Sequence, residues 1–122
     1  MAEFSDLEGK TLSVANKGRC RGGYDEIRFV TEDGDTYRMY HYQECCESVD
    51  IEDINGDLDD LVGTEIVSAI EAIGENNSRY GHETWTFYHL RTAKGDVTIR
   101  WHGESNGYYS ERVHFEKVEG DQ

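Results

Sequence analysis

The last third of the chain carries flat rings, arginines and a side-chain amide at short intervals. Such rings stack on nucleobases, guanidinium groups match phosphate oxygens, and an amide can hydrogen-bond a base edge, so these types together describe a pocket for a nucleotide-like molecule. The alternative is that the rings pack in the core and across strands while the arginines pair with surplus acids, and the sequence leaves both readings open. The residues concerned are Trp85, Phe87, Tyr88, Arg91, Arg100, Trp101, Asn106, Tyr108 and Tyr109.

An imidazole, two thiols and a carboxylate lie close together in the sequence at His41, Cys45, Cys46 and Glu47. Thiolates and imidazoles suit zinc, but structural zinc sites usually pair Cys-x2-Cys motifs, and here the cysteines are adjacent with no second pair downstream. A thiol near a histidine can be a nucleophile, yet no nucleophile motif, phosphate-binding loop or His-Glu-x-x-His segment is present. We therefore expect a tight connection between strands with small buried thiols, no metal, no cofactor and no enzyme activity.

Acidic residues are concentrated in the middle of the chain. Glu32 to Glu71 holds thirteen acids and one base, whereas Arg79 to Lys117 holds five acids and six bases. The net charge of −14 disfavours nonspecific binding to nucleic acid, which is itself a polyanion. Asp53 to Asp60 has the oxygen ligands of a calcium loop, but Leu58 and Thr64 stand where that loop needs glycine and glutamate. The carboxylates fit either a solvated face or an imitation of a phosphate backbone.

The 122 residues fit one domain, residues 1–122, because one hydrophobic core is usual at this length. No stretch approaches the ~20 apolar residues that span a bilayer, and Met1 to Lys10 lacks the apolar run of a signal peptide. Three cysteines, an odd number that includes a vicinal pair, favour reduced thiols. We expect an intracellular protein that does not enter a membrane.

Hydrophobic alternation and turn signals predict a mainly antiparallel β fold of about seven or eight short strands with one short helix. Two hairpins are expected, Tyr24–Thr31 with Thr36–Tyr42 and Glu83–Thr92 with Val97–His102. Asp57 caps the short helix, which runs through Leu61. The other expected strands are Thr11–Ala15, Val49–Ile54, Thr64–Ile73 and Tyr108–Val118, and the expected loop is Gly74–His82.

The three C-terminal strands are expected to follow one another in a single antiparallel sheet. Because side chains alternate across a strand, one face of this sheet packs and the other is free to bind. In the middle strand Val97, Ile99 and Trp101 share one face, and Thr98, Arg100 and His102 share the other.

Several segments carry a specific order of residues, namely His41–Val49, Ile51–Ile54, Gly56–Leu58, Thr84–Tyr88, Thr98–Gly103 and Ser105–Ser110. Together they span roughly residues 24–116 and resemble a small domain, of mostly unassigned function, that is common in phage and prophage genomes. The domain is also similar to the phage Thoeris anti-defence sponges of the Tad-one type. That resemblance implies an oligomer with ligand pockets at subunit contacts, no catalysis, and capture of cyclic ADP-ribose isomers or cyclic oligonucleotides.

These observations lead to the hypothesis of a phage-encoded binding protein, in the cytoplasm of an infected bacterial host, that sequesters a nucleotide-derived immune signal without cleaving it. Its partners are then a small nucleotide-like ligand and further copies of the chain, with no membrane and no direct nucleic-acid binding. The ligand-binding residues are Arg28 and Arg100 for phosphates, Trp85, Phe87 and Tyr108 for stacking, Asn106 for polar recognition, and Arg91 beside them. The alternative is an acidic phage protein that inhibits a host nucleic-acid-binding defence enzyme by protein contact or nucleic-acid mimicry.

Overall fold

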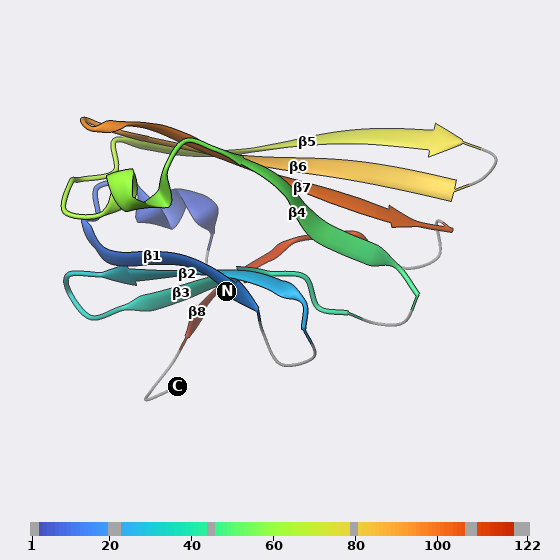
Figure 1. Ribbon diagram of the computed structural model, residues 1–122, viewed down its shortest axis with the longest axis horizontal. Coiled ribbons are helices and arrows are strands. Elements are labelled where there is room, and N and C mark those ends of the chain that lie inside the picture. The colour runs from blue at the N-terminus through green and yellow to red at the C-terminus, as the bar shows by residue number, and fades with distance from the viewer. Residues whose placement is uncertain (1–2, 20–22, 44–45, 79–80, 107–109, 119–122) are drawn as a thin grey trace.

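Antiparallel pairing organises the chain into two sheets of four strands each. In the computed structural model, which describes residues 3–19, 23–43, 46–78, 81–106 and 110–118, the sheets stack face to face (Figure 1). The first sheet has the order β1 (Leu12–Arg19), β2 (Asp25–Thr31), β3 (Thr36–Tyr40), β8 (His114–Val118). The second sheet has the order β4 (Ser48–Asn55), β7 (Gly95–Ser105), β6 (Gly81–Thr92), β5 (Ser68–Ser78). The predicted mainly antiparallel β fold is confirmed.

The core lies between the inner faces of the two sheets. The predicted β2–β3 hairpin is confirmed, and its register sets Ile27 against Met39 and Phe29 against Tyr37, all of them buried. From the second sheet the fully buried Trp101 reaches across the core, and its Nε1–H donates to the Met39 Sδ at 3.2 Å. The two sheets are therefore joined by a polar contact as well as by apolar packing.

The alternation predicted for the middle C-terminal strand, now β7, is confirmed. Val97, Ile99 and Trp101 are buried on the inner face. Their neighbours on the outer face, which points away from the first sheet, are Thr98, Arg100 and His102, and all three are half-buried. The sequence therefore separated the two faces of this strand correctly, and the structure shows which of them packs.

The prediction of three consecutive C-terminal strands in one sheet is wrong for the last strand. The β6–β7 hairpin forms as expected, but the chain then crosses to the first sheet, where β8 pairs with β3 and Met39 lies opposite Phe115 (Figure 1). The predicted turn at Asn106-Gly107 lies partly outside the described residues, because residues 107–109 are not among them. The strand itself is shorter than Tyr108–Val118 and begins at His114.

A buried carboxylate explains why the chain leaves the second sheet after β7. Glu111 accepts hydrogen bonds from the Thr84 Oγ1 at 2.7 Å, the His82 Nδ1 at 2.9 Å and the Ser105 hydroxyl. The backbone between β7 and β8 is thereby fixed against the inner face, where Gly103 leaves room for it. A Cβ atom on Gly103 would lie 2.9 Å from the Cβ of Glu111.

The prediction of a loop at Gly74–His82 is also wrong. β5 continues to Ser78 and β6 begins at Gly81, and the ladder sets Gly74 opposite Trp85 without interruption. This half of the ladder extends beyond the first sheet (Figure 1), so its residues do not need the apolar character that marks a packed strand. Backbone hydrogen bonding to β6 is sufficient, since each strand supplies the other's donors and acceptors.

The predicted short helix is a single 3-10 turn, η2 (Leu58–Leu61), and Asp57 caps it as expected by accepting from the Asp59 N–H at 2.9 Å. A second 3-10 turn, η1 (Phe4–Leu7), was not predicted. Its Phe4 and Leu7 are buried in the core. No α-helix occurs among the residues described.

The connection between β3 and β4 carries the cluster of His41, Cys46 and Glu47. The expectation of buried, reduced thiols is wrong for Cys46, which is exposed and disulfide-bonded. The other two cysteines, Cys20 and Cys45, lie outside the described residues. The tight connection is instead held by the buried His41 and Glu47, whose side chains contact each other.

Candidate functional site

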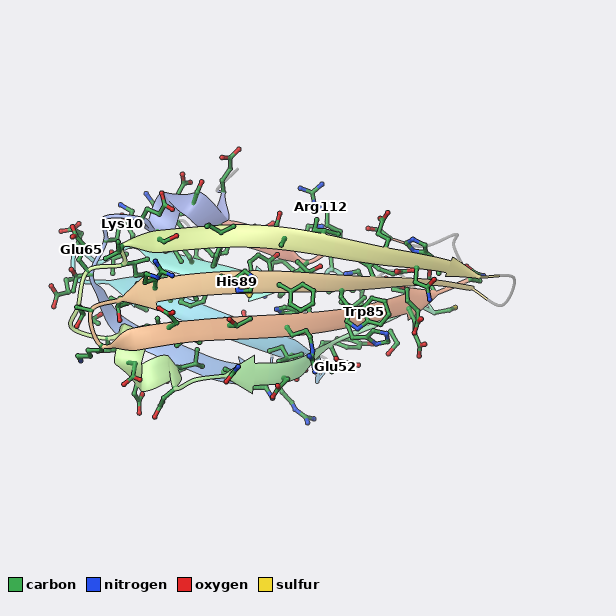
Figure 2. The ribbon with its side chains drawn as sticks, turned by 90° about the horizontal axis from the view of Figure 1, so that it is seen from above. Lys10, Glu52, Glu65, Trp85, His89 and Arg112 are labelled. Atoms are coloured by element: carbon green, nitrogen blue, oxygen red, sulfur yellow. The ribbon has the colours of Figure 1, made fainter. Side chains whose placement is uncertain are left out.

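The outer face of the second sheet brings together most of the predicted binding residues. Trp85, Phe87 and Arg91 alternate along β6 with the buried side chains of that strand, and Phe87 lies opposite Arg100 in the ladder. Figure 2 looks onto this face and shows Trp85 and His89 along β6. We call this set the outer aromatic face, and it consists of Trp85, Phe87, His89, Arg91, Thr98, Arg100 and His102.

The rings of the outer aromatic face contact their neighbours but keep part of their surface in solvent. Phe87 stacks on His89 with centroids 6.2 Å apart and an interplanar angle of 2°. Trp85 packs against His102 at 5.1 Å, tilted by 46°. Trp85 and Phe87 are both half-buried. Half-buried rings on an open sheet can stack on a flat guest without unfolding any part of the core.

The arginines of this face pair with carboxylates in exposed positions. The Arg100 Nε lies 2.7 Å from the Glu52 Oε1, with the two side chains 40% and 39% exposed, and Arg91 lies 3.5 Å from Asp96. The Arg100 Nε–H, although close to Glu52, does not meet hydrogen-bond geometry with any partner. Exposed ion pairs contribute only about 0–1 kcal/mol, so a better acceptor can displace them.

A shallow hollow of about 320 Å³ lies at one end of the outer aromatic face. Ile70 of β5 and His89 of β6 form its apolar wall, and Arg91 supplies a cation at its side. Ile70 is 55% exposed, which is unusual for a large apolar side chain. The hollow therefore combines an apolar surface with a guanidinium group.

Two of the predicted ligand-binding residues, Arg28 and Asn106, are not brought to this face. Arg28 lies on the outer face of the first sheet, on the opposite side of the sandwich, and its Nε is 3.6 Å from Glu26. Asn106 is exposed beyond the end of β7 and lines a separate hollow of about 440 Å³ with His82. Tyr108 lies outside the described residues. Arg28 and Arg100 therefore cannot hold the same small guest on one chain.

Two other rings that the sequence grouped with the binding residues belong to the core. Tyr88 and Trp101 are both 0% exposed and point to the inner face. The packing alternative was thus correct for these two rings. It also describes Trp85, which packs across the strands on His102, and the two arginines, which pair with Glu52 and Asp96, although Trp85 and Phe87 keep part of their surface in solvent.

Both ring nitrogens of His41 are used inside the protein. The Nδ1–H donates to the Arg112 carbonyl oxygen at 2.6 Å, and the Nε2 is 2.8 Å from the Glu47 Oε2. With side chains only 2% and 0% exposed, His41 and Glu47 form a buried hydrogen-bonded pair. No nitrogen lone pair is left for a metal, so the pair serves the connection between the sheets.

One group among the described residues has side chains close enough to hold a metal ion. One ligand atom each from Glu83, His102 and Glu104 lies within 4.8 Å of the others, next to the Trp85 ring. The His102 Nε2 and the Glu83 Oε1 are 3.1 Å apart. Glu83 and Glu104 face each other across the β6–β7 ladder.

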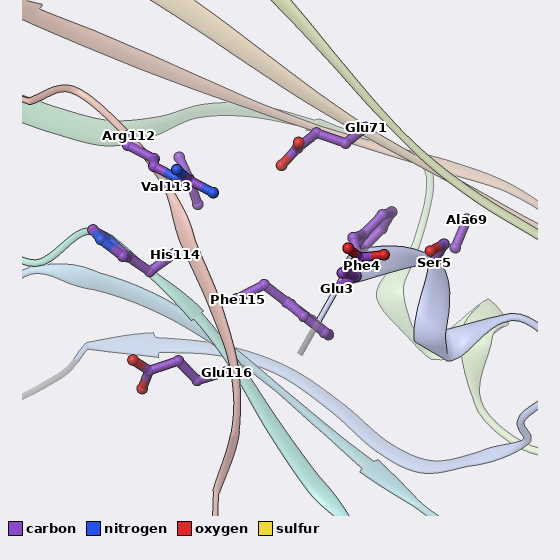
Figure 3. Close-up of a pocket in the computed structure, with 10 residues that line it drawn as sticks. All are labelled: Glu3, Phe4, Ser5, Ala69, Glu71, Arg112, Val113, His114, Phe115 and Glu116. Atoms are coloured by element: carbon purple, nitrogen blue, oxygen red, sulfur yellow. The ribbon is translucent and has the colours of Figure 1, made fainter. Parts of the chain in front are cut away.

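A pocket of about 460 Å³ opens between the two sheets, beside η1 and the start of β5. Its walls are apolar where Phe4, Val113 and Phe115 meet, and Phe4 and Phe115 are edge-to-face at 5.6 Å. In Figure 3 the side chains of Glu71 and Arg112 reach toward each other from opposite walls. Neither forms an ion pair with a residue that the structure describes. We call this the inter-sheet pocket.

The hydroxyl of Tyr88 lies next to the inter-sheet pocket but does not line it. The ring packs on Phe4 at 4.6 Å, and Tyr88 is opposite Glu71 in the β5–β6 ladder. The hydroxyl is buried and completes no hydrogen bond of standard geometry. Burial first, and then the nearby Glu71 carboxylate, raise the pKa of Tyr88 above its usual range, while Arg112 opposes this effect. The hydroxyl therefore stays protonated.

The residues of the inter-sheet pocket were missed by the sequence reasoning. Phe4 is a single apolar residue in an acidic N-terminal segment, with no periodicity around it. Glu71 was interpreted as part of a solvated acidic stretch, and Arg112 as part of a strand beside β7. Only the alternating segment around Phe115 gave an indication from the sequence. It correctly predicted a strand, but it did not predict that this strand pairs with β3 in the first sheet.

Residues 5–115 match the family model described as Domain of unknown function (DUF7448). No curated protein and no solved structure gives a significant match to the chain. Among the residues described, no helix has the length and apolar character that a bilayer crossing requires.

Proposed function

The chain belongs to the DUF7448 family of unknown function, and we propose that it is a phage-encoded binding protein that sequesters a nucleotide-derived bacterial immune signal without cleaving it. It would act in the cytoplasm of the infected host. The guest would bind on the outer aromatic face. The observation that supports this most directly is the Phe87 ring lying opposite the Arg100 guanidinium, with both side chains at the surface.

Local charge makes an anionic guest compatible with an acidic protein. The Debye length is about 8 Å at physiological ionic strength, so distant carboxylates are screened and the nearest cations dominate at contact. Arg100 has an Nε–H without a hydrogen-bond partner, and its ion pair with Glu52 is exposed and weak. A phosphate oxygen could therefore replace Glu52 as the acceptor.

Self-association through β5 would complete the proposed binding site with residues of a second copy of the chain. β5 is an edge strand of the second sheet, and Ile70 and Ile73 on it are 55% and 59% exposed. An edge strand with exposed apolar side chains is a template for pairing with another strand. Pairing two β5 edges would bring the hollow at Ile70 and Arg91 next to the same hollow of a second copy.

Calorimetry with cyclic ADP-ribose isomers and with cyclic di- and trinucleotides tests the binding proposal. We expect micromolar or tighter binding of at least one compound, with quenching of Trp85 fluorescence because the other tryptophan, Trp101, is buried. Arg100→Ala should weaken binding about tenfold or more, since it removes a charge-assisted contact. Arg28→Ala on the opposite face is the matched control and should have no effect. The absence of heat with every compound would refute the proposal.

The oligomer is tested separately by sedimentation equilibrium. Ile73→Lys places a charge on the β5 edge and should shift the protein toward the monomer. Val67→Lys alters an equally exposed apolar residue, 63% exposed, just before β5 and should have little effect. A wild-type protein that is monomeric at the highest soluble concentration would contradict the pairing of β5 edges.

The acidic edge of the second sheet supports one alternative function. Asp50, Glu52 and Asp53 are exposed on β4, and Asp57 and Asp59 continue the exposed carboxylates toward η2. Such an array suits inhibition of a host nucleic-acid-binding defence enzyme by mimicry. Capture of a purified nuclease by the wild type, lost after neutralising these acids while the outer aromatic face is intact, would favour this alternative.

A further inference from the structure

The charges around the inter-sheet pocket do not suit a phosphate-bearing guest. Three carboxylates, those of Glu3, Glu71 and Glu116, line the pocket with a single guanidinium, Arg112. The local balance of charge is therefore negative, in a chain whose net charge is −14. The field in and around this pocket attracts cations.

The apolar part of the pocket suits an organic group rather than a hydrated ion. Phe4, Val113 and Phe115 are all at least nine-tenths buried, and their side chains form one continuous wall with Ala69. A volume of about 460 Å³ lies within the ~300–1,000 Å³ range of pockets for small molecules. Aromatic faces beside carboxylates are also the environment in which cation–π contacts hold ammonium and guanidinium groups.

The Tyr88 hydroxyl provides a further polar group next to the pocket. It is buried near Glu71 and Arg112, and its ring packs on Phe4, so three residues that line the pocket surround it. Its contact with the Glu71 carboxylate, although short of standard hydrogen-bond geometry, contributes to the raised pKa of Tyr88. Glu71 is exposed, so an N–H group that enters the pocket could reach the same carboxylate.

We propose that the inter-sheet pocket is a binding site for a small organic cation, a primary ammonium or guanidinium group on an apolar body. The apolar body would lie against Phe4 and Phe115, and the cation would donate hydrogen bonds to the Glu71 carboxylate and to the Tyr88 hydroxyl oxygen. The same chemistry is offered by a free amine and by a lysine or arginine side chain of another protein. This site is separate from the outer aromatic face and does not depend on the proposed function.

The proposal is tested by titrating the whole protein with three cations and one matched anion, followed by amide chemical shifts. The cations are phenethylamine, agmatine and a terminally blocked lysine peptide, and the anion is 3-phenylpropionate. We expect saturable shifts at residues around the pocket with a dissociation constant of about 1 mM or tighter for at least one cation, and none for the anion. Phenethylamine binding without peptide binding would indicate a free amine, and equal binding of the peptide a protein partner.

Two variants separate a binding role from a structural one. Glu71→Gln should weaken cation binding about tenfold, because a charge-assisted hydrogen bond becomes a neutral one. Glu75→Gln, on the same strand and face but outside the pocket, is its control and should bind like the wild type. Tyr88→Phe should weaken binding several-fold, because a cation held by Glu71 would lose the hydroxyl oxygen as a second acceptor.

Several results would overturn the proposal. These are no saturable binding of any cation, equal binding of 3-phenylpropionate, or identical affinities for Glu71→Gln and Glu75→Gln. The nucleotide titrations on the outer aromatic face remain interpretable in each case, because Glu71 and Tyr88 point to the inner face.

Discussion

Replacing Glu47 by glutamine tests whether the buried pair with His41 holds the two sheets together. The His41 imidazole donates to the Arg112 carbonyl oxygen and contacts the Glu47 carboxylate at 2.8 Å, with both side chains almost completely buried. Removing one member of a buried ion pair typically costs about 3–5 kcal/mol, because the remaining group keeps its desolvation penalty without its partner. For a domain of this size that loss corresponds to a decrease in melting temperature of roughly 10–20 °C.

Urea denaturation followed by tryptophan fluorescence measures this effect directly. The midpoint should decrease for Glu47→Gln with little change in slope, which would indicate lost stability rather than a changed unfolded state. The double variant with His41→Asn should lose less than the sum of the single variants, by about 0.5–3 kcal/mol, since the two groups interact. Asp96→Asn, which breaks the exposed Arg91 pair, is the control and should leave the midpoint unchanged. If Glu47→Gln behaves like this control, the pair is not a source of stability.

Three further outcomes are expected. The stability that Tyr88 contributes is fully present below the usual tyrosine pKa of about 10 and decreases as the pH rises above it. The reason is that the pKa of Tyr88 is raised in the folded state, so above that pH only the unfolded state ionises readily. Unfolding measured from pH 9 to about 12 should therefore show a loss that is absent in Tyr88→Phe. Gly103→Ala should destabilise by about 1–3 kcal/mol because its Cβ would press on Glu111 and Val49, whereas Gly74→Ala, with open space around it, should be tolerated when both are compared by thermal melting. Asp57→Ala should lower the stability by about 1 kcal/mol through loss of the cap on η2, measurable as a small shift in the urea midpoint.

Local patterns in the sequence were sufficient to predict the strands whose two faces differ. β7 alternates apolar and polar residues because one face contacts the core, and this alternation correctly placed Trp101 and Arg100 on opposite faces of the strand. The β2–β3 hairpin was found for the same reason, with turn residues Glu32 to Asp35 between its strands. These features depend only on neighbours in sequence.

Features that depend on distant parts of the chain were not predictable in this way. The crossing of β8 to the first sheet depends on Glu111 meeting Thr84 and Ser105 in space, and an isolated glutamate in the sequence does not reveal such partners. The inter-sheet pocket likewise combines Phe4 with Glu71 and Arg112, which come from three separate segments. Sequence reasoning found the surface site on one sheet and missed the pocket built between two.

The two free edges of the second sheet differ in a way that limits how far assembly can proceed. β4 carries the exposed carboxylates of Asp50, Glu52 and Asp53, which repel the acidic surface of a second copy. Its register is irregular near Ile51, so its backbone groups do not offer a continuous row of hydrogen bonds to another strand. β5 is regular along its whole length. If β5 edges pair as proposed, a sheet with one receptive edge and one repellent edge would join a single neighbour, so assembly would end at a closed pair and would not continue into a fibre.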